Sequence, residues 1–142
     1  MKIQQISIFL ENKSGRLADV THTLYEAGLN MRALSLADTN EFGILRMIVD
    51  NPERAKEVLK AAGFTVNIAS VIALEVPNSP GGLDNILQMF SQKGVNVEYM
   101  YAFASLCDDK AVLIIRIDNT DLGIQELQAC GCTLLPQSKI LK

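Results

Sequence analysis

The sequence predicts an α+β protein made of two ferredoxin-like βαββαβ units in tandem, each with an antiparallel sheet that carries helices on one face. The first observation behind this prediction is an internal duplication, in which residues 11–65 match residues 77–133. The second is that strand-like and helix-like patterns alternate in the same order in both copies. No linker rich in proline, glycine or serine separates the copies. We therefore expect two tightly joined domains, over residues 1–68 and 69–142.

The duplication is based on identities at a nearly constant spacing. At a shift of 66 positions, the matching pairs are Asn12 and Asn78, Gly15 and Gly81, Leu17 and Leu83, Gly28 and Gly94, and Asn30 and Asn96. Past residue 44 the shift becomes 68, and the matches continue from Leu45 with Leu113 to Thr65 with Thr133. The two extra residues fall where a hairpin turn would best tolerate them.

Each copy begins with a strand and an amphipathic helix. Alternating apolar residues predict the strand: Ile6, Ile8 and Leu10 in the first copy, and Ile72, Leu74 and Val76 in the second. An apolar stripe predicts the helix that follows: Leu17, Val20 and Leu24, and then Leu83, Ile86, Leu87 and Phe90. Gly28 and Gly94 stand where a helix commonly ends.

A hairpin, a second helix and a short strand complete each copy. We expect the hairpin strands over residues 30–37 and 43–50, joined by the turn 38–41, and over residues 96–105 and 111–118. Asn51, followed by Pro52, and Asn119 favour the start of the second helix, which should end at Gly63 or Gly131. Residues 64–68 and 132–135 are expected to form the last strands.

One predicted strand is apolar on both faces. Residues 111–117 are almost entirely apolar, and Tyr99, Tyr101 and Phe103 share one face of the neighbouring strand. An antiparallel strand with helices on one side should be polar on the other. We expect this open face to be covered by the sheet of another chain; the alternative is deep packing against the helices of the same chain.

Composition excludes several classes of function. The formal net charge is −3 and no basic cluster is present, which disfavours a nucleic-acid partner. No long uncharged apolar stretch or secretory signal is evident, so no membrane association is expected. The three cysteines, Cys107, Cys130 and Cys132, follow no metal-ligand spacing. We interpret them as reduced thiols of a cytoplasmic protein that needs no cofactor or metal.

The loops after the first strand of each copy are the best candidates for a binding site. Residues 11–17 and 77–83 combine asparagine and glycine immediately before a helix. The first amides of a helix lack internal partners, so such a loop can bind an anion such as a carboxylate. The side chains of Asn12, Asn78, Asn30 and Asn96 can both donate and accept hydrogen bonds. Alternatively, these residues only form turns and caps.

At these residues the sequence resembles the ACT domain, a small regulatory module of amino-acid metabolism. The family pattern is a strand, Asn or Asp, two residues, Gly, one residue, Leu, a helix, and Gly-x-Asn. Residues 78–83 and 94–97 fit it closely, whereas the first copy has Ser14 where the family often has proline. The resemblance spans nearly the whole chain. It implies domains that pair side by side, often extending one sheet to eight strands, with amino acids bound at the shared interface.

The resemblance implies which residues would bind the ligand. The loop asparagine of one domain and the strand-two asparagine of its neighbour would hold it, which gives Asn12 or Asn78 with Asn30 or Asn96. The full candidate set is Asn12, Ser14, Gly15, Arg16, Leu17, Asn30, Asn78, Pro80, Gly81, Gly82, Leu83 and Asn96. We expect a non-catalytic sensor of a free amino acid that forms a homodimer or higher homo-oligomer. The alternative is a ligand-free interaction module, or a detached regulatory subunit of an amino-acid biosynthetic enzyme.

Features of other protein classes are weak in this sequence. His22 is the only histidine and falls off the apolar stripe of its helix, which predicts a surface position. Cys130 and Cys132 are expected to be buried or half-buried thiols, and Asp108 with Asp109 to form a solvated turn. Residues 42–45 are weakly similar to the third-strand motif of RNA-binding domains. The basic and aromatic residues that this motif requires are missing from the same copy.

Overall fold

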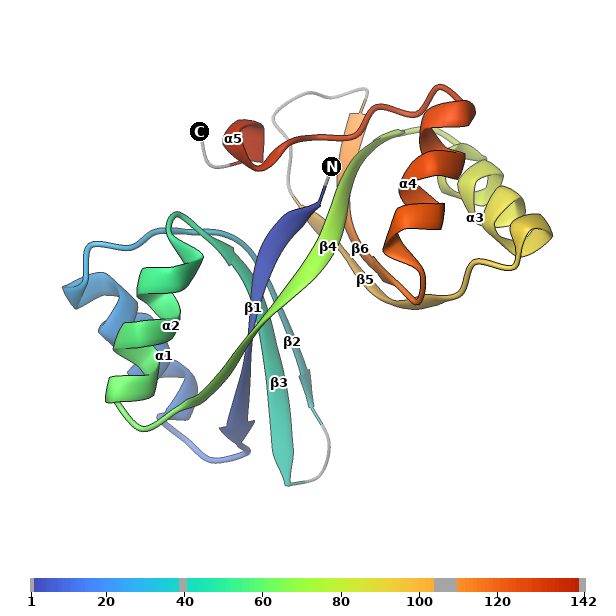
Figure 1. Ribbon diagram of the computed structural model, residues 1–142. Helices are drawn as coiled ribbons and strands as arrows, with labels where there is room; N and C mark the ends of the chain where they lie inside the picture. Colours follow the sequence, from blue (N-terminus) through green and yellow to red (C-terminus); the bar gives the residue numbers. More distant parts are fainter. Residues whose placement is uncertain (1, 39–40, 104–109, 141–142) are drawn as a thin grey trace. The chain divides into compact units, whose positions relative to one another are not determined.

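The computed structural model describes residues 2–38, 41–103 and 110–140 (Figure 1). The chain divides into two compact units, here called the first unit, residues 4–69, and the second unit, residues 70–140 with the residues before Gln4. Each unit has the predicted order of strands and helices, with an antiparallel sheet and helices on one side. The predicted fold class is therefore confirmed.

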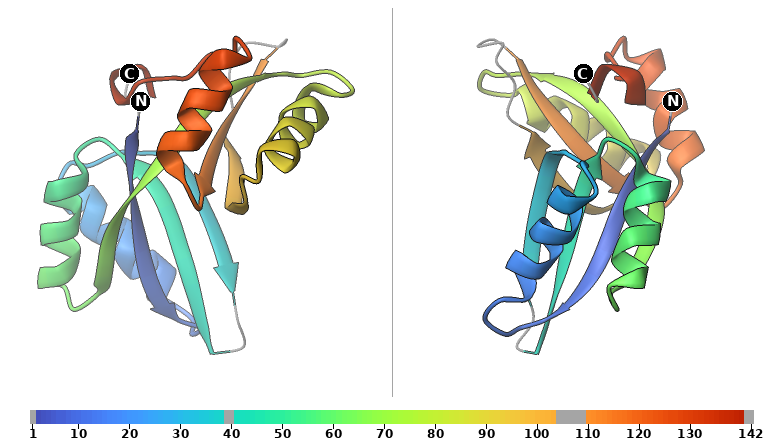
Figure 2. Two further views of the ribbon diagram at one scale, coloured as in Figure 1. Left: turned by 45° about the vertical axis from the view of Figure 1, so that its right-hand side comes forward. Right: turned by 90° about the vertical axis from the view of Figure 1, so that its left-hand side faces the viewer.

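The first unit has an antiparallel sheet with two helices on one face. Its elements are β1 (Ile3–Glu11), α1 (Arg16–Glu26), β2 (Met31–Asp38), β3 (Phe42–Val49), α2 (Pro52–Ala61) and the beginning of β4 (Thr65–Pro77). The strand order is β2-β3-β1-β4. Figure 2 shows α1 and α2 side by side on one face of these strands. The core between them consists of alternate strand residues, such as Ile8 and Leu45, and the helix residues Leu24 and Leu59.

The second unit repeats this arrangement. Its further elements are α3 (Gly82–Lys93), β5 (Val97–Phe103), β6 (Lys110–Ile117), α4 (Thr120–Ala129) and α5 (Gln137–Ile140), of which α5 was not predicted. The strand order is β4-β6-β5. The core again combines alternate strand residues, such as Leu74 and Ile115, with the helix residues Phe90 and Leu127.

Two strand boundaries differ from the prediction. The sequence predicts separate strands at the end of the first copy and the start of the second, but β4 runs without a break from Thr65 to Pro77. Nothing between these residues is a proline or glycine, so the extended backbone has no cause to turn. The expected last strand, residues 132–135, is reduced to one bridge between Leu74 and Leu134. Pro136 follows at once and has no N–H group with which to extend the pairing.

The predicted apolar stripes are mostly buried. Val20 and Leu24 of α1 and Phe90 of α3 are almost inaccessible, whereas Leu17 is 39% exposed because it lies in the first turn of α1, next to the loop. The apolar character of β6 on both faces corresponds to burial on both faces. Ile115 lies in the helix-side core, and Ile114, on the opposite face, is also fully buried. Pairing with another chain stays a prediction.

Helices α2 and α4 begin at asparagine caps, as predicted. The side-chain oxygen of Asn51 accepts a hydrogen bond from the Arg54 amide at 3.2 Å, and that of Asn119 from the Leu122 amide at 3.1 Å. We predict that Asn51→Ala or Asn119→Ala lowers the free energy of unfolding by about 1 kcal/mol, because one helix amide loses its partner. Urea denaturation measures the change. Asn51→Asp and Asn119→Asp, which keep the acceptor, should stay near wild type; equal losses in all four variants would contradict the capping role.

Candidate functional site

The candidate residues of each copy gather in the loop between a strand and the following helix. Residues 11–17 join β1 to α1, and residues 77–83 join β4 to α3. The asparagine side chains are exposed in both loops, and the Asn12 amide donates to the Glu41 carbonyl at 2.9 Å. Among the other candidate residues, Ser14, Gly15, Leu17, Pro80 and Gly81 are also exposed. Arg16 and Leu83 are half-buried, and Gly82 is buried.

The two loops enter their helices through the same backbone turn. Gly15 has φ 90° and Gly81 has φ 87°, a left-handed conformation that side chains with a Cβ rarely adopt. Each glycine carbonyl accepts the first intrahelical hydrogen bond, from Asp19 or Asn85. Neither helix start has a side-chain cap within the described residues. The Arg16 and Gly82 amides donate back to the Lys13 and Ser79 carbonyls, at 3.4 and 3.1 Å, and the outward-facing amides that come next lie at the positive end of the helix dipole, where they can bind a carboxylate.

Charge distinguishes the two loops. In the first, Lys13 Nζ lies 2.9 Å from Glu11 Oε2. The hydrogen bond and charge of Lys13 hold the pKa of the Glu11 carboxyl below its usual range. Residues 78–83 of the second loop carry no charged side chain. The first loop thus offers both signs of charge to a ligand, and the second offers only backbone and neutral polar groups.

The strand-two asparagines, Asn30 and Asn96, are held in place by their backbone. The Asn30 amide donates to Asp50 Oδ2 at 3.0 Å, and the Asn96 amide donates to Asp118 Oδ1 at 3.0 Å. Both asparagine side chains are exposed. Each aspartate directly follows the last residue of a hairpin strand. The contact with Asp50 therefore fixes the start of β2, and the contact with Asp118 fixes the start of β5.

Within one unit the two kinds of asparagine lie at opposite ends of the sheet. Glu11, next to Asn12, pairs with Phe42, and Met31, next to Asn30, pairs with Val49. The seven steps along β3 from Phe42 to Val49 correspond to about 23 Å, at about 3.3 Å per residue. The structure therefore groups Asn12 with residues 14–17 and separates it from Asn30. One unit alone cannot bring both asparagines to a single small ligand.

A cavity adjoins each loop at equivalent positions. In the first unit it measures about 250 Å³ and is lined by Asn12, Arg16 and Leu17 together with Leu36 of β2 and Gly43 of β3. In the second unit it measures about 430 Å³, and its lining includes Asn78, Pro80, Leu83, Ala111 and Leu113. Sequence reasoning missed the strand residues among these. Only the pairing register, which sets which strand residues lie beside the loop, could have identified them.

His22, Cys130 and Cys132 lie outside the two loops. His22 is exposed and its Nε2 lies 2.9 Å from Glu26 Oε1, as expected for a surface histidine. Cys132 is half-buried as predicted, but Cys130 is exposed, because it lies at the solvent-facing end of α4. Cys107, Asp108 and Asp109 lie outside the described residues.

The described residues hold neither a membrane-spanning helix nor a cluster of metal ligands. No described helix has both the length and the apolar character needed to cross a membrane. Over the same ranges, histidine, cysteine and acidic side chains form no group of three or more that could hold a metal ion.

Several solved structures have folds similar to that of this chain. Protein BT0572 from Bacteroides thetaiotaomicron is 44% identical over all of this chain and 97% of its own, with a TM-score of 0.94. The regulatory subunit of aspartate kinase from Thermus thermophilus is 16% identical, over 89% of this chain and 91% of its own, with a TM-score of 0.65. Aspartate kinase from Synechocystis matches 89% of this chain with 24% of its own length, at 18% identity and a TM-score of 0.60. These last two similarities concern the fold alone.

The family comparison covers most of the sequence. No curated protein matches this chain. A family model described as an ACT domain pair matches residues 1–128, which include both loops and all four asparagines. The chain therefore belongs to the ACT domain pair family, a family of regulatory domains.

Proposed function

We propose that the protein is a non-catalytic cytoplasmic sensor that binds a free amino acid where two ACT domains meet. The observation that carries the proposal is the position of the asparagines at opposite ends of each unit. A ligand held by both kinds of asparagine must lie between two domains. Binding then favours the paired arrangement, because only that arrangement completes the site.

Antiparallel pairing of two domains would complete such a site. If the edge strands of two units run side by side in opposite directions, the loop end of one unit lies beside the strand-two end of the other. Strand β2 is the edge of the first unit. Leu34 and Leu36 of this strand are 52% and 48% exposed, which supports the use of this edge in a homodimer.

The chemistry of the loops suits an α-amino acid. Its carboxylate can accept from the outward-facing amides at the start of α1 or α3. Its ammonium group can donate to the side-chain oxygen of Asn12 or Asn78 and of a strand-two asparagine. In the first loop, Lys13 and Glu11 add one charge of each sign. Lys13 and Glu11 pair with each other, and the pKa of the Glu11 carboxyl lies below its usual range rather than near neutral pH, which suits binding better than proton transfer.

A second candidate function is that of an interaction subunit of an enzyme. The exposed leucines of β2 favour it, because an apolar strand edge can bind a different protein as readily as a second copy. The similarity to the fold of a protein named as a regulatory subunit of aspartate kinase is compatible with this candidate.

We predict that one amino acid, or a few related ones, will raise the melting temperature of the protein. A ligand at about 100 times its dissociation constant adds about 2.7 kcal/mol to the stability of the folded state, or roughly 5–10 °C for a chain of this size. The measurement is thermal unfolding with each of the twenty amino acids at millimolar concentration. Asn12→Ala and Asn78→Ala should each reduce the shift, and the double variant should abolish the part of it that binding between the domains contributes.

Asn67→Ala provides the matched control, since this exposed asparagine lies in β4 and belongs to neither loop. It should leave the ligand-induced shift unchanged. The absence of any shift with all twenty amino acids would contradict the sensor and favour the interaction subunit, for which pull-down would then identify the partner.

The glycine turn yields a further prediction. Gly81→Ala should lower the free energy of unfolding by about 1–2 kcal/mol, since alanine resists the left-handed backbone. No atom lies within 4 Å of the added Cβ, so the loss reflects the backbone alone. Gly81→Asn should cost less, because asparagine tolerates this turn. Denaturant unfolding measures both, and equal losses for alanine and asparagine would contradict a backbone origin.

A further inference from the structure

The two units differ at a pair of positions where their backbones are equivalent. Residue 16 is the first residue of α1, after the N-cap Gly15, and residue 82 is the first residue of α3, after the N-cap Gly81. Residues 64 and 132 likewise follow α2 and α4, and their amides donate to Leu59 and Leu127 at the same distance, 3.0 Å. The first unit has arginine and phenylalanine at these positions, whereas the second has glycine and cysteine.

In the first unit the two large side chains meet. The guanidinium carbon of Arg16 lies 4.7 Å from the centre of the Phe64 ring, a cation–π contact. Phe64 is only 6% exposed. The arginine therefore bridges the start of α1 and the segment after α2, and it fills the space between them.

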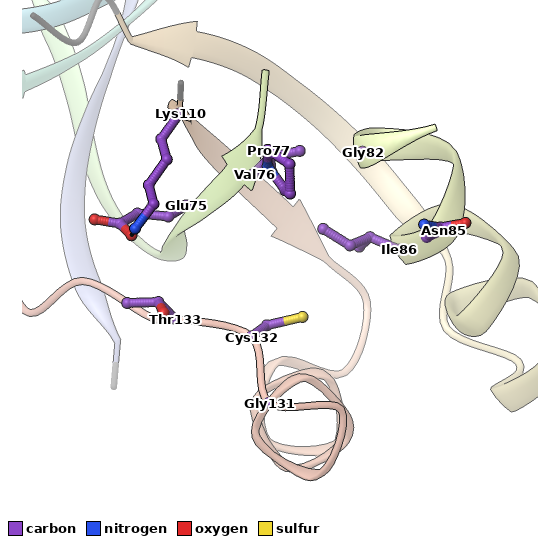
Figure 3. A pocket seen from close by; sticks show the side chains of 10 residues that line it. All are labelled: Glu75, Val76, Pro77, Gly82, Asn85, Ile86, Lys110, Gly131, Cys132 and Thr133. Carbon is purple, nitrogen blue, oxygen red and sulfur yellow. Dashed lines mark ion pairs between the residues drawn. The ribbon is translucent and has the colours of Figure 1, made fainter. Parts of the chain in front are cut away.

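In the second unit the equivalent space is a pocket of about 430 Å³ (Figure 3). The Cys132 thiol and the Ile86 side chain point into it from opposite walls. A large side chain at position 82 is not compatible with this backbone, because a Cβ there would overlap the Pro77 carbonyl oxygen. The pocket is thus a consequence of the local fold of the second unit and of the small side chain at Cys132.

The pocket wall carries one charge of each sign. Lys110 Nζ lies 3.4 Å from Glu75 Oε2, and both residues line the pocket together with the Asn85 side chain. Val76 and Ile86 supply an apolar surface. The equivalent positions of the charged pair in the first unit are Phe9 and Phe42, which lack any charge. The charged pair and the pocket therefore occur together in the second unit.

We propose that this pocket is a second ligand site, contained within the second unit, for a small zwitterion of the α-amino acid class with an apolar side chain. The proposal rests on the proposed function for the class of ligand. Lys110 would pair with the carboxylate and Glu75 with the ammonium group. A zwitterion that replaces the contact between Lys110 and Glu75 in this way leaves each side chain with a partner of opposite charge. Val76 and Ile86 would contact the side chain, and the volume falls within the usual range of small-molecule sites.

Cys132 makes occupancy of the pocket measurable. Burial raises the pKa of its thiol, so we expect slow alkylation in the free protein. Cys130 is exposed and close in sequence, which makes it an internal control. The experiment treats the full chain with iodoacetamide, with and without valine, leucine, isoleucine or methionine at millimolar concentration, and follows each thiol by tandem mass spectrometry.

We expect at least one of the four amino acids to slow alkylation of Cys132 about tenfold at roughly ten times its dissociation constant, while Cys130 reacts at its original rate. Cys132→Phe, which introduces the residue of the first unit, should abolish that amino acid's thermal shift in a protein that also carries Asn12→Ala and Asn78→Ala. Cys132→Ser in the same background preserves the pocket and should retain the shift.

A second variant tests the charged pair without filling the pocket. Lys110→Met should weaken protection of Cys132 about tenfold, the loss of one charge-assisted contact. Lys60→Met, at an exposed position of the first unit, should leave protection unchanged. Because both side chains point at least partly to solvent, neither change should prevent folding.

The outcomes separate this site from the interface site. Protection of Cys132 that survives Asn12→Ala and Asn78→Ala supports the pocket, even if the interface site fails. Unchanged alkylation of Cys132 with all four amino acids overturns the pocket. If a thermal shift that depends on the asparagines is seen at the same time, the proposed function stands without the pocket.

Discussion

The direction of the strands is the constraint on which the candidate interface site depends. In a βαββαβ unit the first helix returns the chain to the end of the sheet where it began, so β1 and β2 run parallel with β3 between them. Asn12, after β1, and Asn30, before β2, must then lie at opposite ends of the sheet. Any function that uses both requires two domains, and this is why pairing and binding are linked.

The duplication explains why the two units have equivalent loops but different interiors. The glycine turns and the aspartate contacts to Asn30 and Asn96 have the same geometry in both units. The space between the helix start and the last segment is filled by Arg16 and Phe64 in one unit and left open in the other. Local backbone geometry is thus common to both copies, while side-chain volume distinguishes them.

The sequence was sufficient for the order of elements because local patterns determine it. The caps at Asn51 and Asn119 involve residues three apart, and the stripes of α1 and α3 repeat within single helices. The unbroken β4 was missed, because duplication suggested a boundary where the backbone has no turn. The pocket is lined by residues that are far apart in the sequence, such as Glu75 and Cys132, and no local sequence pattern relates them.

The pocket and the loop of the second unit share the start of α3, and this has consequences for regulation. Gly82 lines the pocket, and its amide donates to the Ser79 carbonyl of the loop at 3.1 Å. A ligand that contacts Gly82 and Ile86 therefore restricts the same helix turn that would bind a carboxylate at the interface. In the first unit the contact between Arg16 and Phe64 connects the helix start to the segment after α2 without a ligand. If the pocket binds a ligand as proposed, we expect a response through the helix start in the second unit alone, because Arg16 and Phe64 already fill the equivalent space of the first unit.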